Sequence, residues 1–272
     1  YIIEKLARIP VRVELASEFR YRNPILNPKS LVIAISQSGE TADTLAAIRE
    51  AKAAEAKTMA IVNVVGSSIA RESDAVLYTM AGPEISVATT KAYSAQLVAN
   101  YLFALKLAFI KGKLTKEELD KYIEELKTLP DKIARVIEDK ERLQWFTAKF
   151  SNAKDVFFIG RGIDYAISLE GSLKMKEISY IHSEAYAAGE LKHGTISLIE
   201  EGTMVIGVLT QTDVLEKTVS NMVEVKSRGA YLAGITGYGN YNIEDTVDFT
   251  VYVPKTADIF SASLAIIPLQ LM

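Results

Sequence analysis

The stretch Leu31-Val-Ile-Ala-Ile-Ser-Gln-Ser-Gly-Glu-Thr41 joins an apolar run, a polar turn and the start of a helical pattern. Its first five residues predict a buried strand, and residues 41–56 predict a helix. Further along, residues 59–64 and 75–79 predict strands and residues 89–110 predict a long helix. Alternation of strands with helices is typical of a parallel sheet in an α/β fold.

The second half of the chain repeats this layout. Strands are predicted at 156–159, 204–209, 230–235 and 249–253, with helices at 165–181, at 214–228 and from Ser261 onward. Ile33 and Ile61 are 28 positions apart, and their counterparts Ile206 and Ile235 are 29 apart. The chain therefore reads as two copies of one α/β unit, offset by about 170 residues.

The offset also predicts what each copy lacks. The counterpart of the strand and turn at 156–162 would precede residue 1, and the second copy reaches residue 272 while still inside its last helix. We therefore expect a chain truncated at both ends, with a first domain at 1–112 and a second at 113–272. The second domain would begin with a charged helical connector at 114–143, interrupted at Pro130.

Composition narrows the classes of function. The 272 residues carry a net charge of −3, so the chain lacks the excess of positive charge that is typical of nucleic-acid-binding proteins. The chain has no cysteine and two histidines, so it has no disulfides and no thiolate chemistry, and a His-rich metal site is disfavoured. We find neither a secretory signal nor an uninterrupted apolar run of membrane-spanning length. A cytoplasmic protein is the default expectation.

The turn after the first strand carries the side chains Ser36, Gln37, Ser38 and Thr41. A strand, a glycine turn and a helix N-terminus form a geometry that favours anions, because free N–H groups and the helix dipole point toward the ligand. Neutral hydroxyl and amide donors suit a phosphate monoester. The alternative is a polar turn in which Ser38 only caps the helix. The pattern matches neither a P-loop nor a nucleophile elbow.

A charged stripe lies on the predicted helix at 166–181. Glu170, Lys174 and Glu177 fall in one narrow sector, flanked by apolar residues such as Ile167 and Ile178. An exposed Glu–Lys pair would have polar flanks, so the stripe predicts buried charges with altered pKa values. A carboxylate beside a lysine can move a proton between adjacent carbons of a substrate. A purely structural ion pair is the alternative.

His193 lies in Gly189-Glu-Leu-Lys-His-Gly194, a segment bounded by glycines. A glycine-bounded loop can present an imidazole to a cleft, where it would act as an acid or base near neutral pH.

Four segments together resemble the isomerase region of the glutamine–fructose-6-phosphate aminotransferase family, over essentially the whole chain. They are the 36–41 turn, Glu84-Ile-Ser-Val-Ala-Thr-Thr-Lys91, Glu170-Gly-Ser-Leu-Lys-Met-Lys-Glu-Ile-Ser179 and His182-Ser-Glu-Ala-Tyr-Ala-Ala-Gly-Glu-Leu-Lys-His-Gly194. The resemblance implies two tandem flavodoxin-like sugar isomerase (SIS) domains, each with a parallel sheet flanked by helices.

The resemblance also implies roles for individual residues. Ser36, Gln37, Ser38 and Thr41 would hold the phosphate of fructose 6-phosphate, and Val87 and Thr89 would contact the sugar. Glu177 would move a proton between C1 and C2, assisted by Lys174 with Glu170 beside it. His193 would open the sugar ring from the neighbouring subunit, which implies a homodimer with shared active sites. The product would be glucosamine 6-phosphate, and no metal or organic cofactor is implied.

The chain departs from the family in three places. It lacks the glutaminase domain, the Cys-Gly-Thr-Ser turn expected before Tyr1, and the C-terminal tail whose lysine forms a Schiff base. Two alternatives therefore stay open. One is a sugar-phosphate deaminase or isomerase that has two SIS domains and no glutaminase partner. The other is a sugar-phosphate sensor without catalysis, which would have no use for Lys174 and Glu177.

Overall fold

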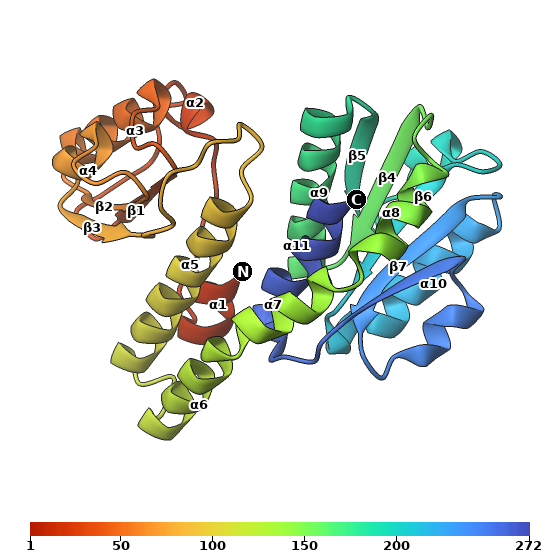
Figure 1. The fold of residues 1–272 in the computed structure, drawn as a ribbon. Helices are drawn as coiled ribbons and strands as arrows, with labels where there is room; N and C mark the ends of the chain where they lie inside the picture. Colours follow the sequence, from red (N-terminus) through yellow and green to blue (C-terminus); the bar gives the residue numbers. More distant parts are fainter. The chain divides into compact units, whose positions relative to one another are not determined.

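A computed structural model describes residues 1–272, and the chain forms two compact units. The first unit comprises Ile2–Thr115, and the second comprises Lys116–Met272 together with Tyr1. Each contains its own parallel sheet (Figure 1).

The first unit is built on a three-stranded sheet. Its strands run in the order β1 (Leu31–Ser36), β2 (Lys57–Val62) and β3 (Ala75–Tyr78), and all are parallel. Its helices are α1 (Ile2–Ala7), α2 (Ala16–Phe19), α3 (Ala42–Ala53), α4 (Ser68–Glu72) and α5 (Lys91–Ile110). Buried residues of the strands pack against Ile48 of α3 and Ile69 of α4. The sheet therefore gains its core from the helices that follow β1 and β2.

The second unit is built on a five-stranded parallel sheet in the order β5-β4-β6-β7-β8. The strands are β4 (Asp155–Gly160), β5 (His182–Ala187), β6 (Met204–Leu209), β7 (Tyr231–Gly237) and β8 (Phe249–Val253). The helices are α6 (Lys116–Lys127), α7 (Leu129–Ile137), α8 (Lys140–Ala148), α9 (Ile163–Ser179), α10 (Leu215–Lys226) and α11 (Ser261–Leu271). The chain leaves β4 toward β5 on one side and returns to β6 on the other. In such sheets, ligands bind at the carboxyl ends of the strands where the order reverses.

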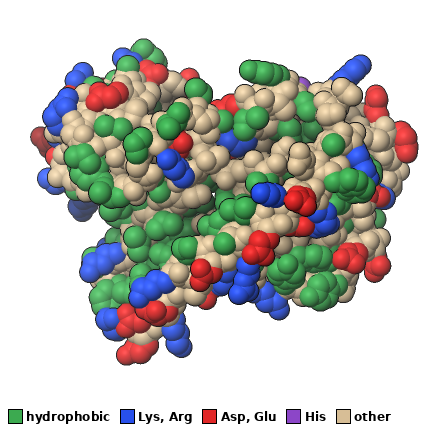
Figure 2. All heavy atoms as spheres, viewed as in Figure 1, with side chains coloured by type: hydrophobic (Ala, Val, Ile, Leu, Met, Phe, Trp, Pro, Cys, Tyr) green, Lys and Arg blue, Asp and Glu red, His purple; other side chains and the backbone are tan.

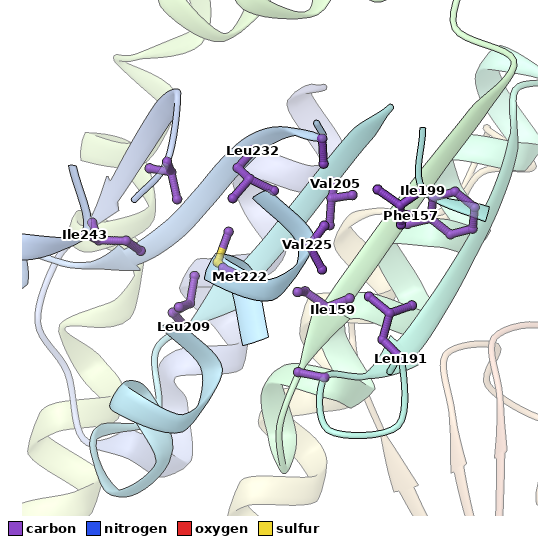
Figure 3. Packing of buried hydrophobic residues seen from close by; sticks show 13 residues of the cluster. Phe157, Ile159, Leu191, Ile199, Val205, Leu209, Met222, Val225, Leu232 and Ile243 are labelled. Atoms are coloured by element: carbon purple, nitrogen blue, oxygen red, sulfur yellow. The ribbon is translucent and has the colours of Figure 1, made fainter. Parts of the chain in front are cut away.

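The side chains of successive β4 residues point to opposite faces of this sheet, as the two-residue period of a strand requires. Phe157 and Ile159 belong to the buried cluster that includes Met222 and Val225 of α10 (Figure 3). On the other face, a Cβ added at Gly171 of α9 would lie 3.2 Å from Phe158. Because β4 is apolar on both faces, helices cover both sides of the sheet.

Every predicted strand and helix is present in the predicted order, and residues 204–209 and 249–253 match β6 and β8 at both ends, but α1, α2 and α4 were not predicted. Strand β5 was missed because its sequence, His182-Ser-Glu-Ala-Tyr-Ala187, has neither an apolar run nor a helical period. The predicted connector helix is three helices, α6, α7 and α8, and Pro130 lies in the first turn of α7. Helix α6 has no buried residue, and its charged side chains face solvent (Figure 2).

Helix α5 has the length and apolar composition of a membrane-crossing helix. It is not an uninterrupted apolar run, because Lys91 and Lys106 lie within it. Its buried residues include Tyr101 and Leu105, and α1 packs against it. Core helices of globular proteins meet the same criterion.

Candidate active site

The turn after β1 presents hydroxyl groups around a helix N-terminus. The backbone N–H of Gly39 donates to Ser36 Oγ at 3.0 Å, and the N–H of Glu40 donates to Ser38 Oγ at 3.2 Å. Each hydroxyl accepts one bond from the turn, which leaves its own hydrogen to donate outward. The side chains of Gln37 and Thr41 make no hydrogen bond within the chain. The turn therefore offers several neutral donors to one ligand.

Helix α3 begins at Ala42, and Thr41 in the N-cap position makes no side-chain cap bond. Ser38 bonds to the turn and not to the first turn of the helix. The first N–H groups of α3 consequently point out of the helix without a side-chain acceptor. This geometry differs from the simple cap that was the alternative interpretation, and it matches the arrangement that binds anions.

Glycine is required at position 39 for two reasons. Its φ of +68° lies in the left-handed region that disfavours residues with a Cβ. A Cβ there would also lie 2.1 Å from Ser67 Oγ. Two hydrogen bonds from the start of α4 also hold the turn: the Ile69 N–H donates to the Gly39 carbonyl, and the Ser68 N–H donates to the Glu40 carboxylate. The hydrogen bonds from Ser68 hold the pKa of the Glu40 carboxyl below its ordinary value.

The two predicted sugar contacts lie just before α5. Thr89 Oγ1 donates to the Val87 carbonyl at 3.4 Å, and the Val87 side chain is almost fully exposed. Glu84 Oε2 accepts the N–H of Ala92 in the first turn of α5. The segment is therefore folded back over the start of that helix.

The second unit holds the charged cluster on α9. The Lys174 ammonium donates to Glu177 Oε2 and lies 3.6 Å from Glu170 Oε1. The lysine side chain is 5% exposed, compared with 15% for Glu170 and 33% for Glu177. Burial raises the pKa of the Glu170 carboxyl, since desolvation outweighs the attraction of Lys174, and the charge of Glu177 raises it further. Sequence reasoning thus predicted the grouping of the three side chains, but burial is nearly complete only at Lys174 and decreases through Glu170 to Glu177.

The predicted apolar flanks of this cluster are partly wrong. Ile167 is buried, but Leu173 and Ile178 are 43% and 57% exposed. The face of α9 that meets the sheet instead carries small residues. Among them, Ser172 exchanges hydrogen bonds of 2.8–3.0 Å with Ser183 of β5. Small side chains let the helix approach β5 closely at this point.

The structure does not bring His193 to the lysine cluster within one chain. Helix α9 starts at the carboxyl edge of the second sheet, and Glu177 lies about 20 Å down its axis, near the amino edge. His193 follows the carboxyl end of β5, at the opposite edge. The imidazole is exposed and makes no hydrogen bond within the chain.

Comparison with known proteins decides the family. The SIS domain model matches residues 1–106 and 149–272. The chain belongs to the SIS domain family. It is 59% identical to glutamine–fructose-6-phosphate aminotransferase (isomerizing) of Clostridium tetani over 271 residues, and 56% identical to that of Caldanaerobacter subterraneus subsp. tengcongensis over 272. The whole chain is covered in both cases, but it spans only 45% of each relative's length.

Solved structures agree with this assignment to the SIS family. The C-terminal domain of glucosamine-fructose-6-phosphate aminotransferase from Francisella tularensis has a TM-score of 0.94 and 41% identity, over 99% of this chain and 77% of that one. Glucosamine-6-phosphate deaminase from Thermotoga maritima matches with a TM-score of 0.74 and 25% identity, also over 99% of this chain and 77% of that one. The predicted resemblance and α/β fold are therefore confirmed, and the chain corresponds to the SIS region of the aminotransferase.

The two SIS regions differ at the equivalent turn. After β6, the N–H groups of Thr210 and Gln211 donate to the carboxylate of Asp164 at 2.8 and 3.1 Å. Asp164 is 1% exposed, so a buried carboxylate of the chain itself accepts the N–H groups of this turn. Burial raises the pKa of Asp164 despite these hydrogen bonds. Sequence reasoning missed this residue, which lies just before the helix predicted at 165–181.

Asn63 was also missed in the first SIS region. It directly follows β2 and fixes the segment after β3, since Oδ1 accepts the Ala81 N–H and Nδ2 donates to the Gly82 carbonyl. A polar residue directly after a parallel strand is the signal that would have found it. No cluster of three or more His, Asp or Glu suited to a metal ion occurs in the chain.

Proposed function

We propose that this chain is the sugar-phosphate isomerase part of a glutamine–fructose-6-phosphate aminotransferase. It would convert fructose 6-phosphate and ammonia to glucosamine 6-phosphate, with the ammonia supplied from glutamine by a glutaminase domain of the full-length protein. The observation that carries the proposal is the enclosed Glu170–Lys174–Glu177 cluster. Its most exposed member is Glu177, whose side chain is 33% exposed and can meet a substrate.

The proposed chemistry follows from these side chains. Ammonia adds to the C2 carbonyl of the open-chain sugar, and loss of water leaves an imine. Glu177 then takes a proton from C1 and returns it to C2, while the O1 proton passes to nitrogen. The product is an aldehyde at C1 and an amine at C2. Lys174 would hold Glu177 in place and assist at O1.

The turn after β1 would anchor the substrate's phosphate through Ser36, Gln37, Ser38 and Thr41. A helix N-terminus with neutral donors supports this assignment because it matches a phosphate in both charge and hydrogen bonding. Val87 and Thr89 would contact the sugar. In this scheme residues 1–112 and 113–272 are the two SIS domains.

His193 would open the sugar ring. Its position at the opposite edge of the sheet from Glu177 supports the proposal that each active site takes this imidazole from a second copy of the chain. The functional form would then be a homodimer in the cytoplasm, binding neither nucleic acid nor membrane.

The test uses the full-length protein with fructose 6-phosphate, first with glutamine and then with ammonium. We expect glucosamine 6-phosphate in both cases. Product from neither nitrogen source would refute the proposal. Release of ammonia from glucosamine 6-phosphate with no synthesis from glutamine would instead identify a deaminase, the function named for the Thermotoga maritima neighbour.

Glu177→Gln separates binding from chemistry. We expect the affinity for fructose 6-phosphate to stay within about twofold, because the phosphate anchor is untouched, while turnover falls by at least 10²-fold. Glu216→Gln, which neutralises an exposed acid in the first turn of α10, is the matched control and should change neither quantity. Normal turnover of the Glu177 variant would rule out its assigned role.

A further inference from the structure

Arg161 is a partly buried cation without a carboxylate partner. It directly follows β4, and its Nη2 donates to Asn221 Oδ1 of α10 at 2.8 Å. Its Nε is buried without any hydrogen-bond partner, and no carboxylate lies within 4.0 Å of the guanidinium. Leaving a guanidinium donor unsatisfied costs free energy. Ion pairing therefore does not account for an arginine at this position.

The guanidinium packs on Gly189 instead. A Cβ added at Gly189 would lie 2.8 Å from Nη2 and 3.2 Å from both Cζ and Nη1 of Arg161. The φ of Gly189 is not in the left-handed region, so the backbone alone would accept a side chain there. The guanidinium is thus the group that a Cβ at this position would meet, and it would have to shift to admit one.

The contact lies at the base of the segment that carries His193. The His193 N–H donates to the Glu190 carbonyl at 2.9 Å, and the Glu190 N–H donates to the Ala187 carbonyl at 2.8 Å. Ala188 and Leu191 are buried in the cluster against α10. Because the imidazole itself bonds to nothing in the chain, its place depends on how firmly this turn is held.

We propose that Arg161 is a positioning residue that clamps Gly189 against α10 and so fixes the turn carrying His193. Its action in turnover rests on the proposed function, in which His193 opens the sugar ring. Displacing a reacting group by about 1 Å can cost a factor of 10² in rate. The phosphate anchor lies on other elements, so loss of the clamp should lower kcat and leave KM nearly unchanged.

A double-mutant cycle in the full-length protein tests the clamp without relying on activity. The variants are Arg161→Ala, Gly189→Ala and the pair, and the readout is hydrogen exchange of residues 188–196. We expect about tenfold faster exchange in Arg161→Ala, which loses the hydrogen bond to Asn221. Gly189→Ala should increase exchange less, because the guanidinium can shift to admit the added methyl. Gly189→Ala should have no further effect once Arg161 is gone, because the added methyl then meets no guanidinium.

Arg135→Lys, at an exposed arginine of α7, is the control for a change of cation elsewhere in the unit. Residues 231–237 of β7 should keep wild-type exchange in every variant, which excludes general unfolding. Additive effects of the two alanine substitutions, wild-type exchange in Arg161→Ala, or equal loosening of β7 would each overturn the clamp.

Turnover provides the link to catalysis. Arg161→Ala should lower kcat about 10-fold to 10²-fold in the wild-type background, and should have no further effect in a His193→Ala background. If exchange behaves as expected but turnover is unchanged, the clamp is upheld and the role assigned to His193 under the proposed function fails.

Discussion

Replacing Lys174 with methionine tests the buried charge cluster on α9. Methionine keeps the length and apolar stem of lysine but removes the ammonium that contacts Glu177 and lies 3.6 Å from Glu170. Two carboxylates would then share a largely enclosed site without a cation. We expect a less stable second unit, because an uncompensated buried charge costs more than the ion pair contributed.

The magnitude follows from the exposure of the three groups. Breaking a buried ion pair by removing one partner costs about 3–5 kcal/mol. Glu177 is 33% exposed and can turn toward water, whereas Glu170 is 15% exposed. Since solvent screens one of the two carboxylates, we expect the lower end of the range, about 3 kcal/mol.

The deficit should depend on pH in a defined direction. Burial already raises the pKa of Glu170, and losing the attraction of Lys174 raises it further. A carboxyl whose folded-state pKa lies above its unfolded value loses stability as pH rises through the interval between the two. The Lys174 variant should therefore be least stable at pH 8 and should recover part of its deficit at pH 5.

Urea unfolding at pH 5 and pH 8 measures both effects. Trp145, the only tryptophan of the 272 residues, lies on α8 of the same unit and reports its unfolding by fluorescence. Lys176→Met is the matched control, because Lys176 lies two residues away on α9 with an exposed side chain. It should change the free energy of unfolding by no more than about 0.5 kcal/mol. Equal midpoints for the two variants at both pH values would refute the reasoning.

Three shorter predictions follow from the turns. Burial raises the folded-state pKa of Asp164, so the wild-type protein should lose stability as pH rises above the ordinary aspartate pKa, and Asp164→Asn should remove that loss. In thermal melts from pH 4 to pH 7, an equal dependence of melting temperature on pH in the two proteins would contradict this. Gly39→Ala should destabilise the first unit more than Gly66→Ala, because both have positive φ but only Gly39 meets a neighbouring side chain; equal urea midpoints would contradict the clash. Ser38→Ala should weaken fructose 6-phosphate binding by calorimetry about tenfold, while Thr212→Ala in the second turn should not.

Local sequence patterns predicted most of the fold and part of the candidate site. The strand and turn at 31–41 follow from an apolar run that ends in polar residues and a glycine, and these preferences act within a few residues. The grouping of Glu170, Lys174 and Glu177 follows from helix periodicity alone, because residues three and four apart share a face.

Other features depend on contacts between distant segments. Strand β5 forms because its backbone pairs with β4 and its Ser183 bonds to Ser172, although its own sequence does not resemble a strand. The prediction that apolar residues flank the charged stripe on a buried face was partly wrong because burial also depends on contacts with distant segments. The small residues of α9 decide which face meets the sheet, and their effect depends on what lies opposite.

The sequence by itself determined that this chain alternates strands and helices in two similar halves, that its first turn is rich in neutral donors, and that one helix gathers two carboxylates around a lysine. Only the tertiary structure decided that the lysine is enclosed, that Asp164 fills the second turn, that Arg161 packs on Gly189, and that His193 lies at the far edge of the sheet from Glu177. Composition and periodicity act between neighbours in the sequence, whereas burial and the edge of the sheet that a residue reaches depend on segments tens of residues apart.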